Sequence, residues 1–152
     1  MKKSLIFGVA LLLSTLTAGT ALAQSDAGAA ANPEPSAYIT LDLKAGFVLD
    51  PFLVSVNGGG EVDASTLDEA CVGFINDAPV MKVNWEGTAD FIDIFFYSDT
   101  DPTLVVQLPD GSYVCADDAN ENLLDPERTV EKPAAGEYKI WVGSFDEGHL
   151  LP

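Results

Sequence analysis

The stretch TLVVQLPDGSYVCA, residues 103–116, decides the fold class of this chain. Over residues 104–108, large apolar side chains recur at every second position, which is the period of a β-strand. The following Pro-Asp-Gly at 109–111 combines a fixed φ, a side chain that bonds to its own backbone, and a glycine that tolerates positive φ. We therefore predict a β-hairpin that joins residues 104–108 to residues 112–116.

Further segments share the period of two, with turn-forming residues between them. The run at 91–97 is apolar on both faces, which predicts a central strand. The one helix-like signal is a capping-box pattern at 65–68, sufficient for one or two turns. Many short strands with almost no helix predict an all-β fold, an antiparallel β-sandwich. The other predicted strands are 37–43, 52–56, 81–85 and 138–142, and the other predicted turns are 58–60 and 133–136.

The first residues have the three parts of a secretory signal peptide. A basic start precedes an apolar stretch over residues 5–16 and an A-x-A cleavage site at 21–23. This stretch is shorter than the roughly 20 apolar residues of a membrane-spanning helix. We therefore predict a signal peptide over residues 1–23, and a mature protein that is exported to the periplasm or the extracellular space and does not stay in the membrane.

Two further parts follow the predicted cleavage site. Residues 24–36, QSDAGAAANPEPS, contain small residues and prolines and no large apolar side chain, which is typical of a flexible linker. Residues 37–152 have the length of one domain. We expect this domain to be the β-sandwich.

The chain is strongly acidic, with a formal net charge of −17. Removal of the leader makes the mature protein more negative, because it takes away Lys2 and Lys3 and no acidic residue. A phosphate backbone would be repelled, which excludes a nucleic-acid-binding protein. The charge is explained by solubility or by attraction of cations, Ca²⁺ above all.

Cys71 and Cys115 are the two cysteines of the chain. In an exported protein an even number of cysteines indicates a disulfide, and only one pairing exists here. The alternative is a zinc site, which needs further soft ligands, and the chain has one histidine, His149. We predict the Cys71–Cys115 disulfide.

Three stretches together resemble the bacterial pre-peptidase C-terminal domain: residues 46–65, residues 99–118 and residues 134–145. In that family a strand leads to a P-x-G turn and a short strand ending in an Asp-Asp pair, and a later P-x-x-G-x-Y-x-I-x-V strand follows. The resemblance covers nearly all of the mature domain. It implies a jelly-roll-like β-sandwich with a non-catalytic role, usually attached to secreted peptidases, in which some members bind Ca²⁺ through acidic loops.

The chain departs from this family pattern in three ways. Asp101-Pro102 stands where the family runs directly into its strand, and no peptidase domain is attached. The sequence also stops at Pro152, where the family has a last strand. Either an unpaired edge or an incomplete chain follows from this, and in both cases a partner strand can add at that edge.

Acidic residues at the open end of the predicted hairpin are the best candidates for a metal site. Pairing of the two strands brings residues 99–101 towards residues 117–118, whereas Asp110 lies at the opposite turn. Ca²⁺ takes six to eight oxygen ligands from carboxylates, carbonyls and water. The alternative is that these side chains are solvated loop residues that cap exposed backbone. The candidate calcium ligands, called here the acidic loop set, are Asp99, Asp101, Asp117, Asp118 and Asn120.

Catalytic patterns are weak in this sequence. A Ser-His-Asp triad would depend on His149, close to the chain end, and the chain has no G-x-S-x-G motif. Asp99-Thr100-Asp101 lacks the glycine of an aspartic-protease motif. Trp85 shares a face with other apolar residues and is expected in the core, while Trp141 is expected in the core or against the disulfide.

Three functions remain open, in this order. The first is a non-catalytic exported domain with an accessory role in binding, stabilisation or secretion of a protein or polysaccharide partner. The second is a calcium-dependent carbohydrate- or matrix-binding module, with calcium as its cofactor. The third is a small secreted hydrolase.

Overall fold

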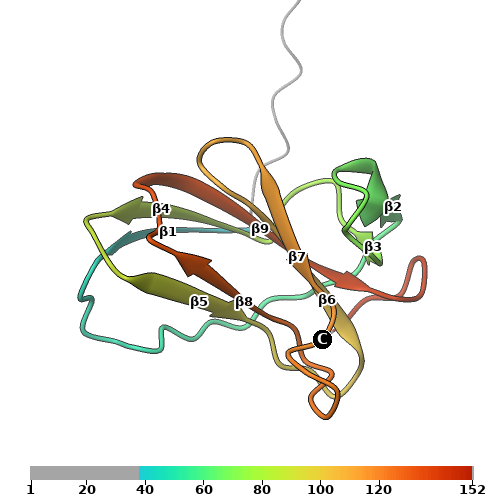
Figure 1. The fold of residues 1–152 in the computed structure, drawn as a ribbon. Coiled ribbons are helices and arrows are strands. Elements are labelled where there is room, and N and C mark those ends of the chain that lie inside the picture. The colour runs from blue at the N-terminus through green and yellow to red at the C-terminus, as the bar shows by residue number, and fades with distance from the viewer. Residues whose placement is uncertain (1–37, 152) are drawn as a thin grey trace, which may run out of the picture. The chain divides into compact units, whose positions relative to one another are not determined.

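A computed structural model describes residues 38–151 (Figure 1). The predicted signal peptide and linker, residues 1–36, lie outside the described residues. Within the described part the protein is all-β, as predicted, with a single short 3-10 helix. No helix in this part is long and apolar enough to cross a membrane. The elements are β1 (Ile39–Lys44), β2 (Val62–Asp63), η1 (Ala64–Thr66), β3 (Phe74–Ile75), β4 (Met81–Glu86), β5 (Phe91–Phe95), β6 (Pro102–Gln107), β7 (Tyr113–Ala116), β8 (Glu127–Glu131) and β9 (Gly136–Ser144).

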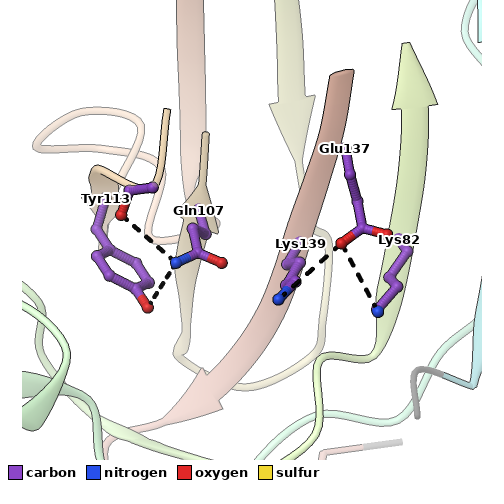
Figure 2. Close-up of polar contacts among 6 residues, drawn as sticks. Lys82, Gln107, Tyr113, Glu137 and Lys139 are labelled. Atoms are coloured by element: carbon purple, nitrogen blue, oxygen red, sulfur yellow. Dashed lines mark hydrogen bonds and ion pairs between the residues drawn. The ribbon is translucent and has the colours of Figure 1, made fainter. Parts of the chain in front are cut away.

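The predicted hairpin is confirmed as β6 and β7. Leu104 pairs with Ala116 and Gln107 with Tyr113 in an antiparallel register. The amide of Leu108 donates to the carbonyl of Ser112 at 2.8 Å, and Gly111 takes a φ of 88°. Figure 2 shows the Gln107 side chain bonded to the Tyr113 hydroxyl, at 2.9 Å, across the two strands.

The central strands are β9 and β6, not the predicted segment at 91–97. β9 pairs with β4 on one side and with β6 on the other, and β6 is buried along nearly its whole length. The run at 91–97 instead forms β5, which belongs to a separate two-stranded sheet with β8. Phe91 is 55% exposed there, so the apolar character of both faces does not reflect a central position.

The two sheets pack as layers through one apolar cluster. Trp85, Tyr138 and Ile140 lie on the inner face of the seven-stranded sheet, and Ile92, Ile94 and Val130 of the β5–β8 pair pack against them. Figure 1 shows the β5–β8 pair lying over the strands of the larger sheet. The alternation along β9 therefore directs Tyr138 and Ile140 into the space between the layers.

The opposite face of β6 and β9 is covered by the segment that contains η1. Val105 and Trp141 pack there with Ala64, Cys71 and Ile75. The predicted disulfide joins Cys71 to Cys115 of β7, with Cα atoms 5.3 Å apart. The expectation that Trp141 packs near the disulfide is thus confirmed, as is the core position of Trp85.

One strand pairing departs from the predicted antiparallel arrangement. β1 runs parallel to β4, from the Ile39–Met81 pair to the Lys44–Glu86 pair. The connection over residues 45–80 is long enough for the crossover that parallel pairing requires. Apolar and polar residues alternate in the same way in parallel and antiparallel strands, so the sequence alone could not show which of the two pairings β1 adopts.

The outer face of this part of the sheet is polar. Lys82 of β4 and Lys139 of β9 both lie beside Glu137, with Nζ–Oε1 distances of 3.7 and 4.0 Å (Figure 2). The Asn84 amide donates to Asp42 of β1 at 2.7 Å. Polar residues on one face and apolar residues on the other make this sheet two-sided, as the period of two predicts.

The strand predicted at 52–56 is absent from the structure. Residues 52–57 form a coil between β1 and β2 (Figure 1). The glycines at 58–60, predicted as a turn, are all buried. A Cβ atom would strike Val142 at Gly58, the backbone of His149 at Gly59 and the backbone of Ile75 at Gly60. Close packing between segments, more than turn formation, therefore explains the three glycines.

Candidate functional site: an apolar cleft between the layers

A cleft of about 690 Å³ opens between the two layers and is bounded by the coil at 46–57. Its volume lies in the range of small-molecule sites, roughly 300–1,000 Å³. We call it the interlayer cleft. Its lining comes from β1, β4, β5, β6, β9 and the coil: Leu41, Leu43, Gly46, Phe47, Asp50, Pro51, Phe52, Leu53, Val54, Ser55, Val56, Asn57, Val80, Met81, Val83, Trp85, Ala89, Phe91, Ile92, Asp93, Ile94, Phe95, Phe96, Tyr97, Leu104, Tyr138, Ile140 and Val142.

Aromatic rings form much of the wall. Phe47 meets Trp85 edge-on, with ring centroids 6.4 Å apart and an interplanar angle of 87°. Phe95 and Tyr97 lie 5.2 Å apart near the open side. The indole Nε1 of Trp85 has no hydrogen-bond partner within residues 38–151, so a lining residue keeps an unused donor.

Tyr138 shows how a polar group is held in this wall. Its side chain is 1% exposed, and its hydroxyl donates to the carbonyl of Ala134 at 2.8 Å. Burial, followed by the carboxylate of Asp110, raises the pKa of the Tyr138 hydroxyl. The hydroxyl is thus a neutral, already bonded group at physiological pH, which suits a structural role in the wall.

The charged groups of the lining are two carboxylates, Asp50 and Asp93. Asp93 accepts a hydrogen bond from the Thr129 hydroxyl at 2.6 Å. Among the described residues that line the cleft there is no Lys, Arg, His, Cys or Glu. The arrangement therefore offers apolar contact with weak negative charge at its edge and no nucleophile–base pair.

Sequence reasoning missed this cleft because it placed the 52–56 segment in a sheet. Phe52, Val54 and Val56 alternate with Leu53 and Ser55, which is a strand pattern like that of the other predicted strands. The absence of a partner strand is visible only in the tertiary structure, so the sequence carried no signal for the open site.

The acidic loop set lies at the end of the β6–β7 hairpin opposite its turn, as predicted. Asp101 directly precedes β6, and Asp117 and Asp118 directly follow β7. Desolvation raises the pKa of Asp101, and repulsion from Asp118 and Asp117 raises it further. The hairpin therefore brings these three carboxylates into electrostatic contact.

The other members of the set are engaged locally or stand apart. The Asn120 side chain accepts from the amide of Asn122 at 3.1 Å, and Asp117 accepts from the amide of Asp118 at 3.0 Å. No hydrogen bond in the described part of the chain joins Asp99 to the other four. Over residues 38–151 no group of three or more His, Cys, Asp or Glu side chains has the geometry to hold a metal ion.

Asp110 and His149 are placed apart from this set. Asp110 accepts from the amide and the hydroxyl of Ser112, at 3.0 and 2.6 Å, inside the hairpin turn. These hydrogen bonds from Ser112 lower the pKa of Asp110. His149 is exposed, and its amide bonds to the carbonyl of Asp146.

Comparisons with protein-family models, curated proteins and solved structures gave no match. The class of the molecule therefore rests on its own architecture, which is an all-β domain of two packed sheets. Its resemblance to the pre-peptidase C-terminal domain stays a prediction.

Proposed function

We propose that this protein is a non-catalytic binding domain of the exported kind, an accessory module similar to pre-peptidase C-terminal domains. It holds an apolar part of its partner in the interlayer cleft. The expected signal peptide and the sequence resemblance support export and an accessory role.

The observation that carries the proposal is the composition of the cleft. Its lining is predominantly apolar, and the cleft has a volume of about 690 Å³. Large side chains at its open side are accessible to solvent: Leu53 is 70%, Phe91 55% and Tyr97 63% exposed. Contiguous exposed apolar surface of this kind marks a binding site in a monomeric domain.

Binding of a neutral fluorescent apolar probe, N-phenyl-1-naphthylamine, tests the proposal. We expect saturable binding with a rise in fluorescence. The probe should also raise the melting temperature, because a ligand that binds only the folded state stabilises it by mass action. An uncharged probe avoids repulsion from the acidic protein.

A matched pair of variants locates the binding. Val54 lines the cleft and is 37% exposed, and Val72 lies outside it and is 40% exposed. Val54→Asp is expected to weaken probe binding about tenfold or more, because a charge must be desolvated in an apolar site. Val72→Asp adds the same charge and should leave binding unchanged. Absence of saturable binding to the wild-type protein would refute the proposed function.

Calcium-dependent binding of carbohydrate or matrix is the second candidate. Repulsion of Asp101 by Asp118 and Asp117, which raises the pKa of Asp101, favours it, since a bound cation would relieve this repulsion. Thermal unfolding with added calcium or with a chelator decides between the two candidates. A rise in melting temperature with calcium that Asp101→Asn abolishes supports the second, and equal curves leave the cleft as the binding element. A hydrolase stays the third and least supported proposal.

A further inference from the structure

The coil at 48–57 has strand-like sequence and no backbone partner. Within the described chain these residues make no hydrogen bond with any other residue. Their apolar side chains are exposed, with Leu53 at 70%. Free N–H and C=O groups on an apolar segment are the features of an edge that accepts another strand.

The next residue fixes the direction and register of such a strand. Gly58 and Leu151 exchange two backbone hydrogen bonds, each 3.1 Å long, and form an antiparallel bridge. Every second pair in an antiparallel ladder is hydrogen-bonded in this way. A strand that continued the ladder would therefore bond to the backbone of Val56, Val54 and Phe52.

The side chains agree with this register. Phe52 and Val54 are 36% and 37% exposed, whereas Leu53 between them is 70% exposed. Val56 packs against the buried cluster of Val80, Val142 and Leu151. Phe52, Val54 and Val56 are thus turned inward more than Leu53 is, and residues directly opposite in a ladder point to the same face. An added strand would place every second side chain in the cleft.

Charge restricts the partner further. The carboxylates in the lining are Asp50 and Asp93, without a lysine or arginine among the described lining residues, and the chain has a net charge of −17. Acidic side chains on a partner would be repelled. The partner strand should be apolar on one face and neutral or basic on the other.

We propose that residues 52–57 receive an extended strand of a partner polypeptide, which runs antiparallel to them onward from the Gly58–Leu151 pair. Its alternate apolar side chains fill the interlayer cleft. This inference rests on the proposed function and specifies the partner: a peptide strand recognised through its backbone.

The test uses a short capped peptide in which valine alternates with threonine and lysine. Binding to the full chain is measured by calorimetry. In the proposed register the valine amides face residues 52–57, and the threonine and lysine amides face away. N-methylation of the valine amides is expected to weaken binding at least about tenfold, because it removes ladder hydrogen bonds. N-methylation of the other amides, the matched control, should change it little.

Variants of the protein give an independent readout. Val54→Pro removes an amide that faces the partner, and Leu49→Pro, which lies outside residues 52–57 and outside the cleft lining, is the control. Only the former should abolish peptide binding. The backbone amides of both residues lack hydrogen-bond partners in the described structure, so both variants should fold. Formation of the disulfide and an unchanged circular-dichroism spectrum would verify this.

Each outcome has a distinct meaning. Equal weakening by both kinds of N-methylation, or equal effects of the two proline variants, would overturn the strand proposal. Failure of the peptide to bind at all would overturn it too. In these cases saturable binding of the neutral probe would still support the apolar cleft, whereas loss of both kinds of binding would refute the proposed function as well.

Discussion

Asp101 is the residue whose ionisation is most affected by its neighbours in the acidic loop set. Desolvation and the charges of Asp118 and Asp117 raise its pKa above the ordinary value of 3.8. The folded protein therefore binds this proton more tightly than the unfolded chain does. Stability is then lost as the pH rises from the ordinary value through the raised one, and the loss persists at neutral pH.

Replacing Asp101 by asparagine should remove that loss. We expect Asp101→Asn to be more stable than the wild type at about pH 6, by about 0.2–1 kcal/mol as for exposed charges, with the difference vanishing at about pH 3. Denaturant unfolding at the two pH values measures it. Asp99→Asn changes the net charge equally and is the control. A gain that is equal in both variants would show that net charge alone is responsible.

Single side chains were in several cases predictable from the sequence. Alternation placed Trp85 in the core, and Trp141, expected in the core or against the disulfide, packs with Cys71 and Cys115. Hairpin pairing also predicted the approach of Asp101 to Asp117 and Asp118. The local engagement of Asn120 was not predictable, because its bond to Asn122 depends on the path of an irregular loop.

The hairpin turn is the element whose geometry the sequence specifies most directly. Gly111 has a φ of 88°, and a Cβ there would meet nothing within 4 Å. A substitution would therefore be opposed by the backbone conformation and not by packing. We expect Gly111→Ala to reduce the free energy of unfolding by about 1–2 kcal/mol.

Gly111→Asn is the matched control, because asparagine tolerates the left-handed conformation. It should lose less than half as much stability as the alanine variant in the same urea titration. An equal loss in the two variants would mean that the turn relaxes out of its positive φ.

Two strand predictions were wrong, one in the existence of the strand and one in its position in the sheet. Residues 52–56 and 91–97 have strand patterns, but the first is a coil and the second contains an edge-like strand, β5. The partner of β5 is β8, whose sequence ERTVE contains one large apolar residue and was not predicted. The alternation of residues in the sequence indicates which face of a segment is apolar. Whether the segment forms a strand depends on the strand that is available to pair with it.

At the scale of the molecule, the disulfide links the segment that contains η1 to β7, on the side of the sheet opposite the cleft. It closes a loop with a sequence separation of 44. In the chain-entropy model, this restriction of the unfolded chain adds about 4 kcal/mol to the free energy of unfolding. In denaturant unfolding, the double variant Cys71→Ser/Cys115→Ser should have a free energy of unfolding lower by up to that amount.

The same variant should keep its probe binding under conditions where it is folded. Cys71 and Cys115 belong to the cluster around Trp141, and the cleft is lined by the separate cluster around Trp85. Loss of binding in proportion to the loss of stability would indicate that the two faces are coupled. Unchanged unfolding of the wild type in reductant would contradict the stabilising role.

The all-β class was predictable for the whole molecule, and the arrangement of its layers was not. Alternation defines two faces for each strand but not which strands are neighbours. β6 and the C-terminal half of β9 bury both faces because the η1 segment covers one and the β5–β8 pair covers the other. The parallel position of β1 depends on the path of residues 45–80, which carries no local signal.

Within residues 38–151, the coil at 48–57 is also where a protease would first cut, since it is exposed, contains leucine and phenylalanine, and has no backbone hydrogen bonds in this part of the chain. Both cysteines lie on the C-terminal side of it, so no covalent link would rejoin the two fragments. β1 would then be held by its ladder to β4 and its side-chain packing alone. Digestion by an enzyme that cleaves after large apolar residues would thus convert one chain into a complex of two.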